Sequence, residues 1–162
     1  MNTDFINLTT ENLADEHLCC IIRSKKSHPG IEAKRQWLSD QAFAKKFGFE
    51  VVDTTDNGYE LLALSFDGTT PKFAPNAKKL EIENKELTIY HDMQCPYIYK
   101  CIEMIKQYCE TNDVPVSFIQ VDTLQKAKEL PCVFNNFAVF YEGVFETVNL
   151  TTIDYLKRIL KK

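Results

Sequence analysis

The stretch Leu87-Thr88-Ile89-Tyr90-His91-Asp92-Met93-Gln94-Cys95-Pro96-Tyr97-Ile98 decides the fold of the second half of this 162-residue chain. Its first four residues are apolar, β-branched or aromatic, which predicts a strand at 87–90. Pro96 suits the first turn of a helix, where its missing N–H would have no helical partner anyway. Apolar residues then recur at helical spacing: Ile98, Ile102, Ile105 and Cys109.

The segments that follow complete a regular α/β pattern. Strands are predicted at 116–121, 137–141 and 144–148, and the last two are joined across Glu142-Gly143. Helices are predicted at 123–129 and 153–160. The resulting order β-α-β-α-β-β-α over residues 87–162 resembles that of a thioredoxin-like domain.

The first half is less regular. The pattern predicts a strand at 5–8, a helix continuing to Ile22, and a helical region at 31–47 that ends at Gly48. Strands at 49–53 and 59–66 flank the turn signal Asp56-Asn57-Gly58 and predict a hairpin. Prolines, Asn76 and a run of charges mark residues 67–86 as a linker or covering segment. We therefore expect an α/β protein with parts at 1–66, 67–86 and 87–162.

The segment Phe43-Ala44-Lys45-Lys46-Phe47-Gly48-Phe49-Glu50, with the later Leu61-Leu62-Ala63-Leu64, resembles the C-terminal end of GNAT-family N-acetyltransferases. Residues 5–22 look like the opening strand and helix of that fold. More specifically, the chain resembles GNAT proteins that carry a YoaP-like C-terminal domain. This resemblance implies a transferase of the acyltransferase class that uses acetyl-CoA.

Two departures from the GNAT pattern bear on activity. The family binds the acetyl-CoA pyrophosphate at a Gln/Arg-x-x-Gly-x-Gly/Ala turn before a helix, a natural anion site. None of the five glycines lies in that pattern: Gly30, Gly48, Gly58, Gly68 and Gly143. Residues 29–40 leave no room for the central strands, and Ala44 stands where the family has a tyrosine general acid. We expect the central acetyl-CoA-binding part to be missing, no cofactor, and no acetyl transfer.

Cys95 lies where a thioredoxin-like domain keeps its active cysteine. A thiolate at a helix N-terminus is stabilised by the dipole and by free N–H groups. Ile98 occupies the place of the second cysteine of a dithiol motif, which leaves monothiol chemistry. His91 could orient or deprotonate the thiol, or share a metal with it.

Cys132 is a second candidate thiol. It follows Pro131, and a proline loop faces the active cysteine in thioredoxin-like proteins. Aligning 137–143 with the usual strand and turn instead places Asn135 at the customary cis-proline position. The alternative for Cys101, Cys109 and Cys132 is that they are small buried hydrophobic residues.

Composition excludes several other classes of function. The net charge is −4 and there is no dense basic face, which argues against nucleic acid as a partner. The six cysteines form no C-x-x-C pair, and two metal ligands do not make a zinc site, so we expect no metal. No stretch approaches the length of a membrane span, and residues 1–5 do not suggest a signal peptide. The prediction is a cytoplasmic, two-domain protein with reduced cysteines.

These observations favour a GNAT N-acetyltransferase-related protein with a YoaP-like C-terminal domain and a binding or scaffolding role. A monothiol thioredoxin-like redox or thiol-binding protein acting through Cys95 is one alternative, and a non-catalytic interaction module is another. The partner would be an unknown small molecule or protein. The incomplete N-terminal sheet could also pair with a second copy, because an open strand edge invites pairing.

Overall fold

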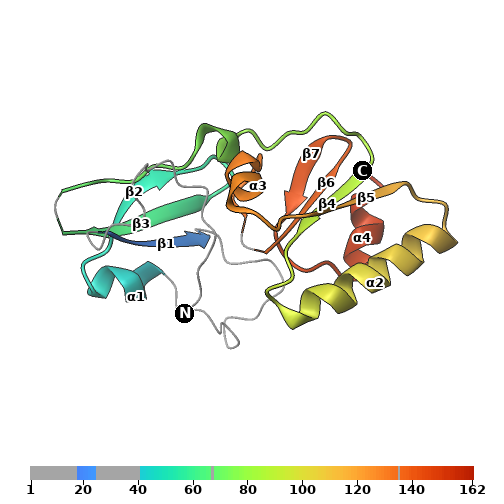
Figure 1. The fold of residues 1–162 in the computed structure, drawn as a ribbon, viewed down its shortest axis with the longest axis horizontal. Coiled ribbons are helices and arrows are strands. Elements are labelled where there is room, and N and C mark those ends of the chain that lie inside the picture. The colour runs from blue at the N-terminus through green and yellow to red at the C-terminus, as the bar shows by residue number, and fades with distance from the viewer. Residues whose placement is uncertain (1–17, 25–40, 67, 135) are drawn as a thin grey trace. The chain divides into compact units, whose positions relative to one another are not determined.

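A computed structural model describes residues 18–24, 41–66, 68–134 and 136–162. It has a mixed α/β architecture with two sheets, which confirms the α/β fold class (Figure 1). The chain divides into two compact units at the bond between Ala74 and Pro75. Within the described residues, no helix is long and apolar enough to cross a membrane.

The first unit is built on an antiparallel three-stranded sheet. Its strands are β1 (Leu18–Ser24), β2 (Glu50–Thr54) and β3 (Tyr59–Ser65), with β3 in the centre. The predicted β2–β3 hairpin is confirmed: Glu50 pairs with Ala63, and the turn closes through a 3.0 Å bond from the Gly58 N–H to the Thr55 carbonyl. A register shift between Val51 and Asp53 marks a bulge in β2.

The predicted helix ending at Ile22 is wrong in its described part. Residues 18–24 form β1, and all seven pair with β3. The apolar run Leu18–Ile22 fits a buried helix or a buried strand equally well by periodicity. Its partner lies about forty residues further along the chain, so local pattern could not decide. The strand predicted at 5–8 and the helical residues predicted at 31–40 lie outside the described residues.

Helix α1 (Gln41–Lys46) ends as the sequence predicts. Gly48 has a φ of +85°, which is the left-handed conformation of a helix terminus. The Gly48 N–H donates to the Lys45 carbonyl at 3.1 Å and so satisfies one of the last carbonyls of the helix.

The second unit has the predicted order of strands and helices. Its elements are β4 (Leu87–His91), α2 (Pro96–Thr111), β5 (Val116–Gln120), α3 (Leu124–Glu129), β6 (Phe137–Tyr141), β7 (Val144–Thr147) and α4 (Ile153–Ile159). The sheet order is β5-β4-β6-β7. β4 and β5 are parallel, whereas β6 is antiparallel to both β4 and β7.

The two inner strands, β4 and β6, are buried on both faces of the sheet. Leu87, Ile89 and Val139 face the cluster that includes residues of α2 and α4. The alternate residues Ala138 and Phe140 face the cluster that includes Ala127 of α3. On α2, the predicted core residues Ile98, Ile105 and Cys109 are buried, whereas Cys101 takes the buried position expected for Ile102, which is only half-buried.

Residues 75–86 pack within the second unit. They include the short 3₁₀ helix η2 (Pro75–Lys78), which contacts α3. The Leu80 N–H donates to the Pro131 carbonyl at 2.8 Å, and Glu81 forms a β-bridge with Val144 beside β7. The segment therefore covers one part of the four-stranded unit.

Candidate functional site

Three loops meet at the carboxyl end of β4. The Val121 N–H donates to the His91 carbonyl at 2.7 Å and extends the β4–β5 ladder by one residue. The Asp92 N–H donates to the Asn136 carbonyl at 3.0 Å and ties the loop before α2 to the start of β6. This end of the sheet is therefore framed by backbone hydrogen bonds from both neighbours of β4.

Cys95 is the N-cap residue of α2, and Pro96 is the first helical residue. The Cys95 backbone is extended, its side chain makes no capping hydrogen bond, and its carbonyl accepts from the Ile98 N–H at 3.1 Å. The thiol is partly exposed. A thiol group thus stands at the positive end of a 16-residue helix without being used to cap it.

His91 and Asp92 are both buried at the end of β4, with 8% and 5% of their surfaces exposed. Burial lowers the pKa of His91, although the Asp92 carboxylate acts in the opposite direction. Burial raises the pKa of Asp92, against the effect of a 2.9 Å bond from the Gln94 N–H to Asp92 Oδ1. The His91 imidazole is consequently held in its neutral form at physiological pH.

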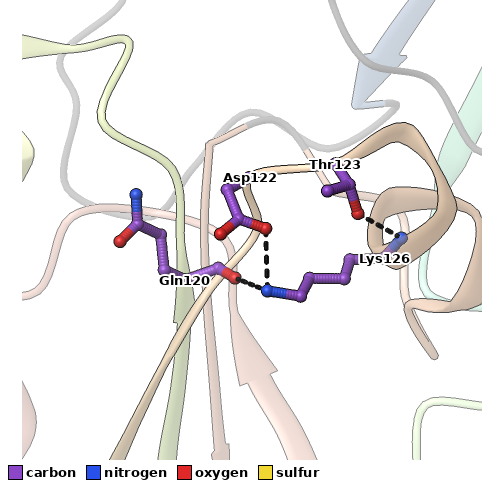
Figure 2. A network of polar contacts seen from close by, with 4 residues as sticks. All are labelled: Gln120, Asp122, Thr123 and Lys126. Carbon is purple, nitrogen blue, oxygen red and sulfur yellow. Dashed lines mark hydrogen bonds and ion pairs between the residues drawn. The ribbon is translucent and has the colours of Figure 1, made fainter.

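The loop after β5 is fixed by a small polar network (Figure 2). Lys126 Nζ donates to the Gln120 carbonyl at 3.2 Å and to Asp122 Oδ1 at 2.7 Å. Thr123 caps α3 by accepting from the Lys126 N–H at 3.2 Å. The ion pair with Lys126 lowers the pKa of Asp122. These contacts hold the segment that carries Val121 beside His91.

The remaining described cysteines are core residues. Cys101 and Cys109 are buried beneath α2, and burial raises the pKa of both thiols. Cys132 is fully buried in the cluster with Phe140, and desolvation raises its pKa to about 12. That cluster is separate from the one that contains the α2 residues Cys101 and Cys109. The side chains of Cys19 and Cys20 lie outside the described part.

The structure brings two of the three predicted candidates, His91 and Cys95, to one end of one strand. Sequence reasoning did not single out Asp92 or Lys126. An Asp side chain often accepts a hydrogen bond from the backbone N–H two residues later, so the Asp92–Gln94 spacing could have identified Asp92. Among the described residues, no group of three metal-ligating side chains is assembled. Asn135, the residue aligned with the cis-proline position, lies outside the described residues.

Comparisons with known proteins place this chain near one family. The model of the YoaP-like family matches residues 115–158. The Uncharacterized N-acetyltransferase YoaP of Bacillus subtilis (strain 168) is 29% identical over 135 residues, which are 82% of this chain and 54% of that protein. The chain therefore spans about half the length of this curated relative. No solved structure matches.

Proposed function

We propose that this chain is an N-acetyltransferase-related protein with a YoaP-like C-terminal domain and a binding role in place of acetyl transfer. The observation that carries the relationship is the similarity to the Bacillus subtilis protein over 82% of the chain. The β2–β3 hairpin that follows α1 supports assigning the first unit to the end of a GNAT-like fold. The sheet order β5-β4-β6-β7, in which β4 and β5 are parallel and β6 is antiparallel to both β4 and β7, supports a thioredoxin-like assignment for the second.

The lack of acetyl transfer is inferred from what occupies the family's functional positions. All four described glycines have positive φ and lie in turns, and none precedes a helix as a phosphate-binding turn would. The N-caps of α2, α3 and α4 are Cys95, Thr123 and Thr152. Ala44, at the position of the family's tyrosine, is buried and has no proton to donate.

Isothermal titration with acetyl-CoA tests this proposal. We expect no binding tighter than about 100 μM, because such affinity needs several kcal/mol of specific contacts and the sequence lacks the pattern that binds the pyrophosphate in the family. An active N-acetyltransferase titrated under the same conditions is the positive control. A lower dissociation constant, or acetylation of an amine substrate, would refute the proposed loss of acetyl transfer. The proposed relationship to N-acetyltransferases would be unaffected.

A second candidate function is a monothiol activity of Cys95. The specific observation is its position at the N-cap of α2, with the thiol partly exposed, whereas Cys101, Cys109 and Cys132 are buried and have raised pKa values. Thiolates react and thiols do not, so burial suppresses the reactivity of those three. Cys95 is the described thiol best placed to react with an electrophile or a disulfide.

Limited labelling with iodoacetamide at pH 7, followed by peptide mass spectrometry, tests the second candidate. We expect Cys95 to be labelled at least about tenfold faster than Cys132, whose pKa near 12 leaves very little thiolate. Cys95→Ser removes the fast-labelled peptide and serves as the control. Labelling of Cys101 or Cys109 at the rate of Cys95 would show that the helix-start position confers no reactivity.

A further inference from the structure

The turn between β2 and β3 contains a chemically reactive pair of residues. Asn57-Gly58 is the one place in the sequence where an asparagine precedes a glycine. The backbone nitrogen of the residue after an asparagine can attack the carboxamide carbon and close a five-membered ring. Glycine has no side chain to hinder that attack, so an Asn-Gly pair reacts readily in an open chain. Asparagine is for this reason one of the thermolabile residues.

The folded turn holds both of the groups that would react. The Gly58 N–H, which carries the attacking nitrogen, donates to the Thr55 carbonyl at 3.0 Å. Asn57 Oδ1, on the carbon that would be attacked, accepts from Thr55 Oγ1 at 2.6 Å. A nitrogen whose proton is held in a hydrogen bond loses that proton less readily. A carboxamide held at its oxygen cannot rotate freely to meet the nitrogen.

The Thr55 hydroxyl that holds the carboxamide is itself fixed. Its oxygen accepts from the Tyr59 N–H at 3.0 Å, so its proton is free for a second partner. The Tyr59 carbonyl lies 3.5 Å from that oxygen, whereas Asn57 Oδ1 is much closer, so Asn57 is the preferred acceptor. Thr55 is buried, with 7% of its surface exposed, so water competes little for this bond.

The leaving group of the reaction is not held. Asn57 Nδ2 is buried and has no hydrogen-bond partner within the described part of the chain. A buried donor without a partner is unfavourable, and departure of this nitrogen as ammonia would remove it. The turn therefore restrains the attacking nitrogen and the carboxamide oxygen, while nothing described binds the nitrogen that would leave.

We propose that Asn57 is a site of spontaneous deamidation that the folded β2–β3 turn holds in check through the Thr55 hydroxyl. The proposal is independent of both candidate functions. Its reactant is water, and Asn57 and Gly58 are only half-buried. A turn opens locally at a lower free-energy cost than the whole domain unfolds. Modification at position 57 therefore records how often this turn has opened.

The reaction balances with one molecule of water. The Gly58 nitrogen gives its proton to hydroxide and bonds to the Asn57 carboxamide carbon. The bond from that carbon to Nδ2 breaks, and the nitrogen takes up a proton and leaves as ammonia. Water then opens the ring at either carbonyl, which gives aspartate or isoaspartate at position 57. Isoaspartate places one more carbon atom in the backbone, so it disturbs the bonds between Thr55 and Tyr59 that close the hairpin.

The test follows the mass of the peptide that contains Asn57 while the full chain is kept at pH 8, either folded or in guanidinium chloride. Deamidation should be about tenfold or more slower in the folded chain, because two hydrogen bonds have to open first. Thr55→Val, which keeps the shape but removes the hydroxyl, should raise the folded-state rate several-fold. Thr55→Ser keeps the hydroxyl and should stay close to wild type. In denaturant all three chains should react alike.

Several results would overturn the proposal. These are equal rates in the folded and denatured chain, a folded Thr55→Val chain that reacts no faster than wild type, and a Thr55→Ser chain as fast as Thr55→Val. Asn112, which precedes an aspartate, is the internal control, and it should react more slowly than Asn57 in denaturant. If Thr55→Val fails to fold, hydrogen exchange of the wild-type Gly58 amide decides. Protection of that amide supports the proposal, and free exchange overturns it.

Discussion

The two ends of the four-stranded sheet use their polar groups differently. At the amino end of β4, the Glu142 N–H donates to the Lys85 carbonyl at 3.0 Å and the Ile82 N–H donates to the Gly143 carbonyl at 2.8 Å. At the carboxyl end, a buried imidazole nitrogen of His91 has no partner in the described chain, and the Cys95 thiol caps nothing. The first end is closed by internal hydrogen bonds, whereas the second retains two side-chain groups, one buried and one partly exposed, that these bonds do not use.

This difference is the reason for assigning a structural role to the amino end of β4 and a candidate site to its carboxyl end. Glu142 and Gly143 both have positive φ, as the central residues of a type I′ hairpin turn require, and the neighbouring segment 82–85 packs tightly against them. Backbone conformation and hydrogen bonding are fully committed there. At the His91–Cys95 end, the backbone is also hydrogen-bonded, but His91 Nδ1 has no described partner and the Cys95 side chain makes no capping bond, so these two groups call for an explanation.

Substitution of a core residue between the two ends of the sheet should give the largest loss of stability. Phe140 is fully buried on the central strand β6 and makes edge-to-face contacts with Tyr90 and Phe145, each with ring centroids 5.6 Å apart. Phe140→Ala should lower the free energy of unfolding by about 3–5 kcal/mol. Urea unfolding followed by circular dichroism measures it. Tyr97→Ala, at an exposed position beside Cys95, should stay within about 0.5 kcal/mol, and an equal loss from both would contradict the assignment of the core.

The closed end should be intolerant of a single added methyl group. A Cβ at Gly143 would lie 2.6 Å from Lys85 Nζ and 2.7 Å from the Ile82 carbonyl oxygen, at a φ of +78°. Gly143→Ala should therefore cost about 1–3 kcal/mol in thermal or urea unfolding. Gly68→Ala is the matched control, since Gly68 has a φ of +89° and open space around its Cβ position. Equal losses would mean that backbone strain alone, and not the contact with residues 82–85, limits this turn.

The same comparison shows what the sequence could predict. Pro96 and the pair Glu142-Gly143 are local signals whose meaning does not depend on distant residues, so α2 and the β6–β7 hairpin were predicted correctly. β1 was missed because its conformation follows from pairing with β3, which is remote in sequence. At the site, the position of Cys95 followed from Pro96, but the burial of His91 depends on how α2 packs over the sheet, which no local pattern reports.

The carboxyl end of β4 should also make stability depend on pH. Burial lowers the pKa of His91 below its usual value near 6.5, so the folded state favours the neutral imidazole. The free energy of unfolding should fall as pH decreases through about 6.5, by less than about 1.4 kcal/mol for each unit of difference between the folded and unfolded pKa values. Asp92, with its raised pKa, acts in the opposite direction as the pH falls further toward its usual range.

Urea unfolding at pH 7.5 and pH 5.5 measures this dependence, and His91→Gln isolates the contribution of the imidazole. The variant should lose the part of the pH dependence that arises near 6.5 while keeping the opposing part from Asp92. An unchanged difference between the two pH values would show that His91 titrates alike in the folded and unfolded states. That result would also weaken the contrast between the two ends of the sheet.

The smallest effect should come from the network that holds the β5–α3 loop beside the site. Lys126 bridges the Gln120 carbonyl and Asp122, but both charged side chains are about half exposed, so water and salt screen the pair. Lys126→Gln should lower the free energy of unfolding by about 0.2–1 kcal/mol, and less at high salt. Lys128→Gln, on the same helix and exposed, should have no measurable effect. A loss well above 1 kcal/mol would mean that the loop after β5 is held at the carboxyl end of β4 as firmly as the Glu142-Gly143 turn is held at the amino end. A loop fixed in this way would favour a small ligand that enters without moving it. A loss within the expected range leaves the loop held mainly by the Val121–His91 backbone bond, so its side chains can adjust around a molecule bound at Cys95.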